Sequence, residues 1–522
     1  MRLTAVAMLL TLTIGCSAEG SFAGADMAVD SDAGSWGGDT DVGDDDDDST
    51  VPEEEDDFLS LPPAQTDTFI FVANPARDTV TRVNVETLEV RTTAVGVNPT
   101  SVLTTPDYAT AAVFNSGDDT VHIIDAASLD SRIVSVRDNF NVMKMSPDGM
   151  FVALWHSIAA ERPDDEVPEG LQSFNETSFV NLVTGEHFPM AVGFNPRDVV
   201  FDSNSLQAAV VSDEYLALVD LQVEPLLPDL IQLSNDLLDV PEAEEVVLSP
   251  SGDFAFVRQF GTQSVLVVDL LTHDVDAIPV GLNPTDLDLS PDGSEAVIVT
   301  RGSDELWILD ASDPYAPAEV LALPLGSGFG SLVFDPTGGQ ALLFTTAYAT
   351  DRYATWNLSN DAIQVRALVK PIKSLGVTPT GESALIFHSL EDADGADTNS
   401  PFYGEWAMTM LSLVDFRTNP LLLPAEPTGF ANSSNGNYGF FIMDEQPLLE
   451  QLDYTTLLHE EIELKSNPVY VGVLPDLDPT DGIEPQAWAS QDHDLGRISF
   501  LDPLSQAVET ITGFELNSQI GE

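Results

Sequence analysis

The sequence is poor in cysteine and in basic residues. Its 522 residues include one cysteine, Cys16, so no disulfide can form within the chain. Lysine and arginine together number 18, against 87 aspartates and glutamates, and the formal net charge at pH 7 is −69. A charge of this size repels nucleic acids and anionic membrane surfaces, so we expect neither as a direct partner. It suits cations or basic proteins, and also surroundings in which salt screens the self-repulsion.

Long apolar runs and short catalytic motifs are missing as well. A membrane-spanning helix needs about 20 apolar residues, and no segment of the sequence provides them. There is no Gly-x-Ser-x-Gly nucleophile elbow, no phosphate-binding glycine-rich loop that ends in Lys-Ser/Thr, and no Cys-x-x-Cys-His haem motif. Hydrophobic residues still make up 43% of the chain, which is enough for a core. The composition therefore predicts a folded protein without a recognisable catalytic motif.

The first sixteen residues look like a bacterial lipoprotein signal. A positive start is followed by an apolar run from Leu3 to Ile14 and then by Gly15-Cys16. In such signals the cysteine is lipidated and becomes the new N-terminus, so residues 1–15 are predicted to be a signal peptide and Cys16 the lipidation site. Thr13 departs from the pattern, which usually has leucine there. The alternative is an ordinary signal peptide with an incidental cysteine.

Residues 16–66 predict an acidic tether that begins at the lipidated cysteine. Residues 17–66 contain sixteen acids and no lysine or arginine, with runs at Asp44–Asp48 and Glu53–Asp57. Such a segment repels itself and buries no apolar surface, so we expect it to be extended and disordered. The chain is therefore predicted to be lipid-anchored at the bacterial outer membrane, facing the periplasm or the cell surface. Its membrane contact would be through the anchor alone.

From residue 67 onward one four-stranded pattern recurs. Two short apolar strands flank a turn in which proline presets φ and glycine accepts a positive φ. Five such turns begin at Ser146, Ser249, Ser290, Asp335 and Thr378. A third strand then ends in Asp or Asn, and a fourth leads to a junction of the form Gly-x-Asn-Pro, as at Gly96 to Pro99. Four-stranded repeats of about 40–45 residues predict the blades of a β-propeller.

The Asx residues at the ends of the third strands number ten, one for each repeat unit. These positions are Asn84, Asp125, Asn181, Asp220, Asp269, Asp310, Asn357, Asp415, Asp453 and Asp502. The first four intervals between them match the last four in order, which indicates an internal duplication: units 1–5 at about 67–290 and units 6–10 at about 291–522. The fold class is therefore all-β, one propeller of about ten blades in two duplicated halves. The alternative is two five-bladed propellers.

Unit 1 is predicted to start at its second strand, because no strand pattern is evident before Phe69. The C-terminal segment Gly513–Asn517 resembles a missing first strand. We expect it to complete unit 1, which would close the ring and remove exposed sheet edges.

The repeats resemble the bacterial YncE/YVTN-type propeller family over about residues 68–519. The resemblance rests on segments such as Ile70–Asn74 and Val265–Asp269, together with the Ser-Pro-Asp-Gly turns. It implies a propeller found in many surface and periplasmic proteins. It implies little about activity, because this fold carries unrelated functions.

Two acidic insertions mark one face of the predicted ring. Because successive strands of a blade alternate in direction, the loops between second and third strands lie on the same face as the junctions between blades. One insertion, 157–175, carries Asp164, Asp165 and Glu166, and its duplicate, 389–405, carries Asp392, Asp394 and Asp397. The second set alternates around a glycine as in oxygen-ligand calcium loops, so calcium is the one cofactor that the sequence suggests. A solvated acidic loop is the alternative, since the closing glutamate of such loops is missing.

Three histidines, His156, His388 and His493, lie at or within the same class of loop. They suggest a metal site or a general base only if they converge, and each is expected in a different blade. We therefore count them with the acidic insertions as a binding face and predict no catalytic residue. The leading hypothesis is a non-enzymatic binding or scaffold protein with an unidentified protein or carbohydrate ligand. The alternative, a lactonase-type hydrolase, is suggested only by the family resemblance.

Overall fold

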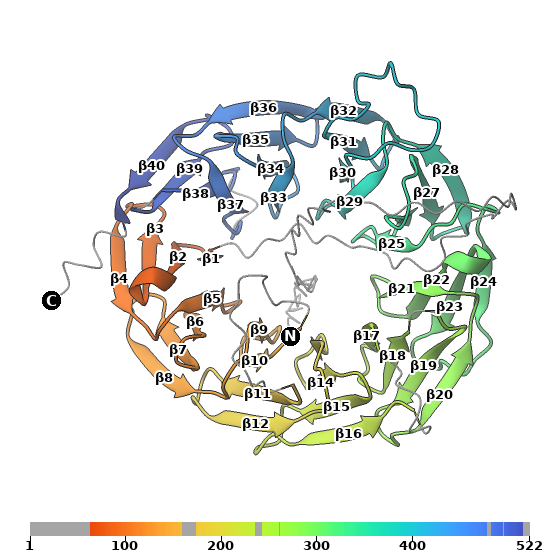
Figure 1. Ribbon diagram of the computed structural model, residues 1–522, viewed down its shortest axis with the longest axis horizontal. Coiled ribbons are helices and arrows are strands. Elements are labelled where there is room, and N and C mark those ends of the chain that lie inside the picture. Colours follow the sequence, from red (N-terminus) through yellow and green to blue (C-terminus); the bar gives the residue numbers. More distant parts are fainter. Residues whose placement is uncertain are drawn as a thin grey trace, which may run out of the picture.

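The structure is a computed structural model, and it describes residues 63–158, 174–234, 243–259, 261–477, 482–493 and 495–514. These residues form ten antiparallel sheets of four strands each, arranged in one closed ring around a central channel (Figure 1). The prediction of ten four-stranded blades in a single propeller is confirmed, and the alternative of two five-bladed propellers is wrong. The described ranges also include two short 3₁₀ helices, η1 (Pro75–Arg77) and η2 (Arg301–Ser303).

The blades follow the chain order, and the first strand of each lies nearest the channel. Blades 1–5 consist of β1 (Ala64–Gln65), β2 (Phe69–Asn74), β3 (Thr79–Asn84), β4 (Val90–Ala94); β5 (Pro99–Thr104), β6 (Thr110–Asn115), β7 (Thr120–Asp125), β8 (Ser131–Ser135); β9 (Val142–Met145), β10 (Phe151–Trp155), β11 (Glu176–Asn181), β12 (His187–Ala191); β13 (Asp198–Phe201), β14 (Gln207–Val211), β15 (Tyr215–Asp220), β16 (Pro228–Gln232); β17 (Glu245–Leu248), β18 (Phe254–Arg258), β19 (Ser264–Asp269) and β20 (Val275–Pro279).

Blades 6–10 repeat this arrangement in the second half of the chain. They consist of β21 (Pro284–Leu289), β22 (Glu295–Thr300), β23 (Glu305–Asp310), β24 (Glu319–Ala322); β25 (Ser331–Phe334), β26 (Gln340–Phe344), β27 (Arg352–Asn357), β28 (Ala362–Ala367); β29 (Ile372–Val377), β30 (Ser383–His388), β31 (Ala407–Ser412), β32 (Thr418–Leu422); β33 (Pro427–Asn432), β34 (Tyr438–Met443), β35 (Leu448–Asp453), β36 (Leu458–Glu463); β37 (Pro468–Val473), β38 (Ala487–Gln491), β39 (Arg497–Leu501) and β40 (Val508–Thr512).

The core lies between the blades. The second and third strands of a blade are covered on both faces by neighbouring blades, and they therefore read as continuous apolar runs, as in β22. The buried apolar residues form ten clusters, and each cluster joins two successive blades, including the pair of blades 10 and 1. Outer strands such as β28 are half exposed. No helix in the described ranges is long and apolar enough to cross a membrane.

The closure of the ring differs from the prediction. The innermost strand of blade 1 is β1, which pairs with β2 and precedes the predicted start of the propeller at residue 67. The expectation that the C-terminal segment supplies this strand is therefore wrong. Side chains fasten blade 1 to blade 10 instead: the Gln65 amide donates to the Val473 carbonyl at 2.6 Å and accepts from the Trp488 indole at 2.6 Å. Phe514 packs into the apolar cluster at this seam, and residues from 515 onward lie outside the described ranges.

The duplication is visible in the hydrogen bonds. His156 Nδ1 bonds the Asn139 carbonyl in blade 3, and His388 Nδ1 bonds the Pro371 carbonyl in blade 8, with the same separation in sequence. The equivalence also corrects one Asx position. The backbone N–H of Ser412 bonds the carbonyl of Arg417, as that of Asp269 bonds Asp274, so Ser412 rather than Asp415 ends the third strand of blade 8. With this change the third strands of units 7 and 8 end 55 residues apart, against 56 residues for units 2 and 3.

Candidate functional site

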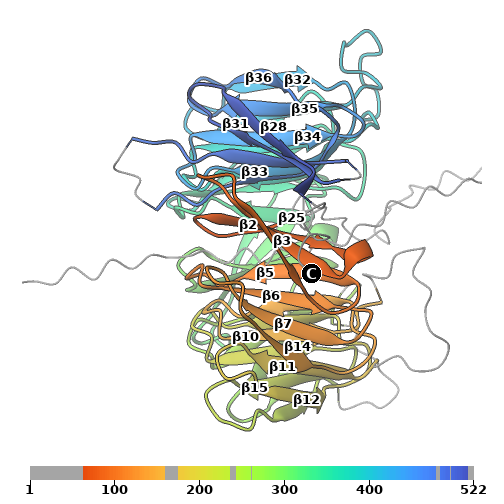
Figure 2. The ribbon, with the colours of Figure 1, turned by 90° about the vertical axis from the view of Figure 1, so that its left-hand side faces the viewer.

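The ring has two unlike faces. The loops between second and third strands and the junctions between blades lie on one face, which we call the insertion face. The tight proline turns and the Asx turns lie on the other, which we call the turn face. Seen edge-on, the long loop between β30 and β31 and the helix η1 project on the same side (Figure 2). Loops on a rigid scaffold are where binding residues usually lie, so each face offers a candidate site.

On the insertion face, the segment 389–406 between β30 and β31 is held by a buried cation. The side chain of Lys370 is 1% exposed, and its ammonium bonds the Leu390 carbonyl at 3.0 Å and Asp392 Oδ1 at 3.0 Å. The other oxygen of Asp392 accepts the backbone N–H of Gly404 at 2.8 Å. One lysine thus fixes the start of the loop, and Asp392 connects that start to its end. The loop therefore leaves the ring in a defined direction, with Leu390 and Tyr403 partly exposed.

The predicted calcium ligands are not assembled as a group. Asp392 is engaged by Lys370 and Gly404, and Asp397 Oδ1 accepts the backbone and side-chain N–H groups of Asn399 at 2.9 Å each. Asp394 is exposed. Among the residues that the structure describes, no group of three or more His, Cys, Asp or Glu side chains is placed to hold a metal ion. The geometry therefore gives the calcium hypothesis no support.

The three predicted histidines lie in three different blades. His388, in blade 8, is fully buried; its Nδ1 bonds the Pro371 carbonyl at 3.1 Å and its Nε2 bonds Thr409 Oγ1 at 2.7 Å. Burial lowers the pKa of His388 to about 4, so it is neutral at physiological pH. His156 is buried in blade 3, and His493, in blade 10, accepts the backbone N–H of Leu495. All three bond within their own blade or its junction, and the structure does not bring them together.

Four further predicted positions lie outside the described residues. These are the lipidation site Cys16 and the acids of the first insertion, Asp164, Asp165 and Glu166. The base of that insertion is described and matches its duplicate: Ile158 is 45% exposed and the equivalent Leu390 is 44% exposed. Both insertions therefore begin with an exposed aliphatic residue directly after a buried histidine and a serine.

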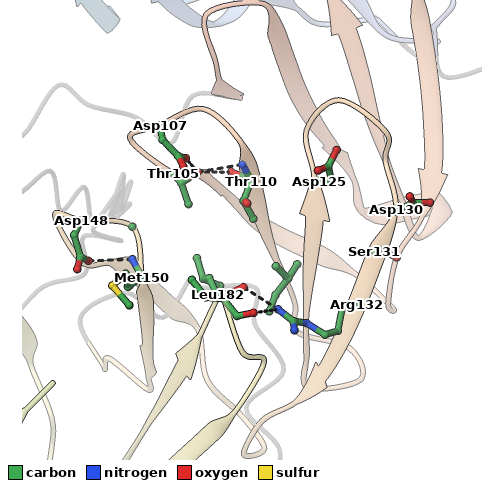
Figure 3. A pocket seen from close by; sticks show the side chains of 13 residues that line it. Thr105, Asp107, Thr110, Asp125, Asp130, Ser131, Arg132, Asp148, Met150 and Leu182 are labelled. Atoms are coloured by element: carbon green, nitrogen blue, oxygen red, sulfur yellow. Dashed lines mark hydrogen bonds between the residues drawn. The ribbon is translucent and has the colours of Figure 1, made fainter. Parts of the chain in front are cut away.

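The turn face carries a cavity that the sequence analysis did not find. It has a volume of about 590 Å³ and lies between blades 2 and 3 (Figure 3). Ile123, Leu182 and Val183 give it an apolar lining, and Arg132 forms the outer wall. The guanidinium of Arg132 donates to the carbonyls of Leu182, Val183 and Thr184, and it thereby joins the two blades.

Four carboxylates surround this cavity: Asp107, Asp125, Asp130 and Asp148. Asp107 Oδ1 accepts the Thr105 hydroxyl at 2.6 Å and the backbone N–H of Ala109, and these bonds lower the pKa of Asp107. The backbone N–H of Ser128, at 2.7 Å, is the largest of several contacts that lower the pKa of Asp125. Both carboxyls therefore stay ionised. Three of the four carboxylates occupy turn positions of the repeat, so their places in the fold could be predicted from the sequence. Which of them line one cavity depends on how the two blades pack.

Glu450 on β35 is a buried acid that belongs to neither candidate site. It is 3% exposed, and its Oε2 has no hydrogen-bond partner. It points into the interface with blade 8, beside Phe441 of the neighbouring strand. Burial, together with the charge of Glu461 opposite it, raises the pKa of Glu450 to about 7. The equivalent position in blade 4 is Ala217, so the first half of the ring has no such group.

Comparison with known proteins supports the fold and nothing finer. No family model matches the chain, and no curated protein matches it. Solved structures do match. A crystal structure of a eukaryotic initiation factor has a TM-score of 0.50 at 12% identity, covering 86% of this chain and 97% of that one. The likeness is one of fold.

Two other similar structures share less of the architecture. The dihydro-heme d1 dehydrogenase NirN, in complex with DHE, has a TM-score of 0.44 at 13% identity and covers 78% of this chain and 76% of its own. The β-propeller domain of Myceliophteria thermophila Cps50 (Swd1) has a TM-score of 0.34 at 13% identity and covers 62% of this chain and 97% of its own. At these identities neither carries an activity over to this protein.

Proposed function

We propose that this protein is a lipid-anchored cell-envelope propeller that binds a partner, a protein or a carbohydrate, through its insertion face and catalyses no reaction. The observation that carries the proposal is the fixed insertion 389–406. Its Lys370–Asp392 anchor is a costly feature, because taking the lysine ammonium and its partner out of water carries a desolvation penalty. A loop that is held in one direction loses less conformational entropy when it binds than a free loop does.

The surface of this loop indicates the chemistry of a partner. Leu390 and Tyr403 expose apolar and aromatic surface, and Glu391, Asp394 and Glu405 are exposed acids around them. Exposed aromatic side chains between polar groups are typical of binding surfaces for proteins and for sugars. The net charge of the chain favours a partner that is neutral or basic at the contact.

The alternative of a lactonase-type hydrolase has no specific observation in its favour. Such an enzyme needs histidines or carboxylates that converge on one reacting atom. The histidines singled out from the sequence lie in blades 3, 8 and 10, and their contacts are local. We therefore favour the binding role.

The test is site-specific photo-crosslinking in cells that produce the full chain. A photoreactive amino acid replaces Tyr403 on the insertion face or, as a control, Leu271, which is 85% exposed on the turn face. We expect a discrete adduct from position 403 and none from position 271. Digestion of the adduct with protease or with glycosidases then tells a protein from a glycan. Equal labelling at both positions, or none at position 403, would overturn the proposal.

A further inference from the structure

The geometry points to a second binding site, independent of the insertion face: the cavity between blades 2 and 3 accommodates a small ligand that carries an alkylammonium group. The cavity, of about 590 Å³, is of the size that small-molecule sites have. Its apolar lining suits a short aliphatic chain, and its four carboxylates suit a cationic end. Ligand chemistry thus follows from the lining.

The groove between blades 2 and 3 lacks the aromatic pair that crosses the equivalent groove between blades 5 and 6. Between blades 5 and 6, Phe254 and Tyr315 meet across the groove with their ring centroids 6.1 Å apart. Burial and the neighbouring Asp276, on β20 of blade 5, raise the pKa of Tyr315. In blades 2 and 3 the position of Phe254 is occupied by Thr110, and no aromatic residue lies in the turn after β11. The groove is therefore left open.

The equivalent groove in the duplicated half carries a different set of side chains. Between blades 7 and 8 the positions of the four carboxylates are neutral (Thr337, Asn357, Ala362 and Thr380), whereas Asp335 and Glu382 stand where Thr105 and Met150 line the cavity. Gln340 stands where Thr110 does, and its amide crosses the groove to the Leu413 carbonyl at 3.1 Å. The duplication therefore does not account for these four carboxylates, since the second copy has none at those positions. The cavity lining is a local feature of blades 2 and 3.

The carboxylates can be neutralised without loss of the turns that they hold. Asp125 and Asp148 each use Oδ1 to accept backbone N–H groups, and an asparagine at either position offers the same acceptor. Asp130 lies on the rim before β8 and is exposed. The triple variant Asp125→Asn/Asp130→Asn/Asp148→Asn therefore removes three charges from the cavity and keeps the fold.

Blades 5 and 6 offer a matched control. Asp269, Asp274 and Asp292 occupy the same three positions of the repeat, on the same face, beside the groove that Tyr315 occupies. Their triple asparagine variant makes the same change in net charge without touching the cavity. A second variant, Ser131→Phe, places a ring in the cavity from the exposed edge strand β8 and leaves every charge in place.

The experiment is calorimetric titration of the full chain, in detergent, with 1,5-diaminopentane at fixed ionic strength. Wild type and the blade 5–6 triple variant should bind with affinities within about twofold of each other. The blade 2–3 triple variant and Ser131→Phe should each bind at least about tenfold more weakly. Pentane-1,5-diol, which has the chain without the charges, should not bind. Nα-acetyl-lysine N-methylamide distinguishes the source: if it binds at the same site the cation is a lysine of a partner, and if only the diamine binds it is a free amine.

Three results would overturn this inference. The first is the absence of saturable binding by wild type, and the second is an equal loss of affinity in the two triple variants, which would make the interaction a general effect of charge. The third is unchanged binding by Ser131→Phe, since a ligand in the cavity has to compete with the ring. None of these results bears on the insertion face, so the two proposals stand or fall separately.

Discussion

Replacement of Lys370 by methionine tests whether the insertion 389–406 is anchored. The substitution keeps the aliphatic stem and removes the ammonium that bonds Leu390 and Asp392. Breaking a buried ion pair by removing one partner costs about 3–5 kcal/mol, because the other charge stays buried without compensation. The side chain of Asp392 is 14% exposed and regains water if the loop detaches. We therefore expect the lower end of that range, about 3 kcal/mol of unfolding free energy.

Lys373 on the same blade provides the control. Its ammonium lies 2.7 Å from Glu426, but the two side chains are 29% and 42% exposed. Exposed pairs contribute about 1 kcal/mol or less, so Lys373→Met should cost no more than that. Chemical denaturation of the full chain measures both variants, and hydrogen exchange reports on residues 389–406 directly. The double variant with Asp392→Asn should cost less than the sum of the two single changes, because each removes the same pair.

The reasoning would be refuted by a particular pattern. If Lys370→Met and Lys373→Met cost the same, or if the exchange of residues 389–406 is unaltered in Lys370→Met, the buried pair does not hold the loop. Additive effects of Lys370→Met and Asp392→Asn would lead to the same conclusion.

Three further predictions concern other parts of the molecule. The pKa of Glu450 is raised to about 7 from an ordinary value near 4.5, so its protonated form stabilises the fold fully below pH 4.5 and this contribution is lost as the pH rises through about 7. Unfolding at pH 4.5 and pH 8 should show that wild type loses about 3 kcal/mol more than Glu450→Gln over this range; parallel pH profiles would contradict the assignment. Phe514→Ala should lower stability by about 3–5 kcal/mol and increase hydrogen exchange in both β2 and β39, since Phe514 packs at the seam of blades 1 and 10; exchange that rises in blade 10 alone would show that the seam is closed by other contacts. Cys16→Ser should move the protein from the membrane pellet to the soluble fraction, and a variant that still sediments with membranes would disprove lipid anchoring at this residue.

The blade count could be predicted from the sequence because each repeat carries its own local signals. The proline turns fix the starts of second strands such as β10, β18 and β22, and the Asx residues fix the ends of third strands such as β7, β11 and β19, whatever the neighbouring blades contain. The first strand of blade 1 was missed because β1 has only two residues, too few to show a period of two. Asp415 was chosen over Ser412 for a similar reason, since a serine can end the third strand without the usual Asx signal.

The candidate sites were less predictable than the fold. The acids of the insertion 389–405 were recognised, but their role was not: Asp392 is bonded by Lys370, which lies 22 residues earlier and sits at the position that Asp138 occupies in blade 3. The cavity on the turn face lies between two blades that lack the aromatic pair of blades 5 and 6, and this difference is visible only when the two interfaces are compared. To predict either site, one would need to know which residues from distant parts of the chain lie side by side.

The way in which blade 1 joins the ring has a mechanical consequence. The chain enters the propeller through β1, which runs from the insertion face beside the channel and pairs with β2 through two residues. Gln65 of the same strand also bonds blade 10 through Val473 and Trp488, and its carbonyl accepts the hydroxyl of Thr104 from blade 2. Any tension on the segment before residue 63 is therefore delivered first to β1, whose Gln65 contacts both neighbouring blades. A pull of sufficient strength would load the two interfaces of blade 1, with blade 10 and with blade 2, while the other eight interfaces remain unloaded.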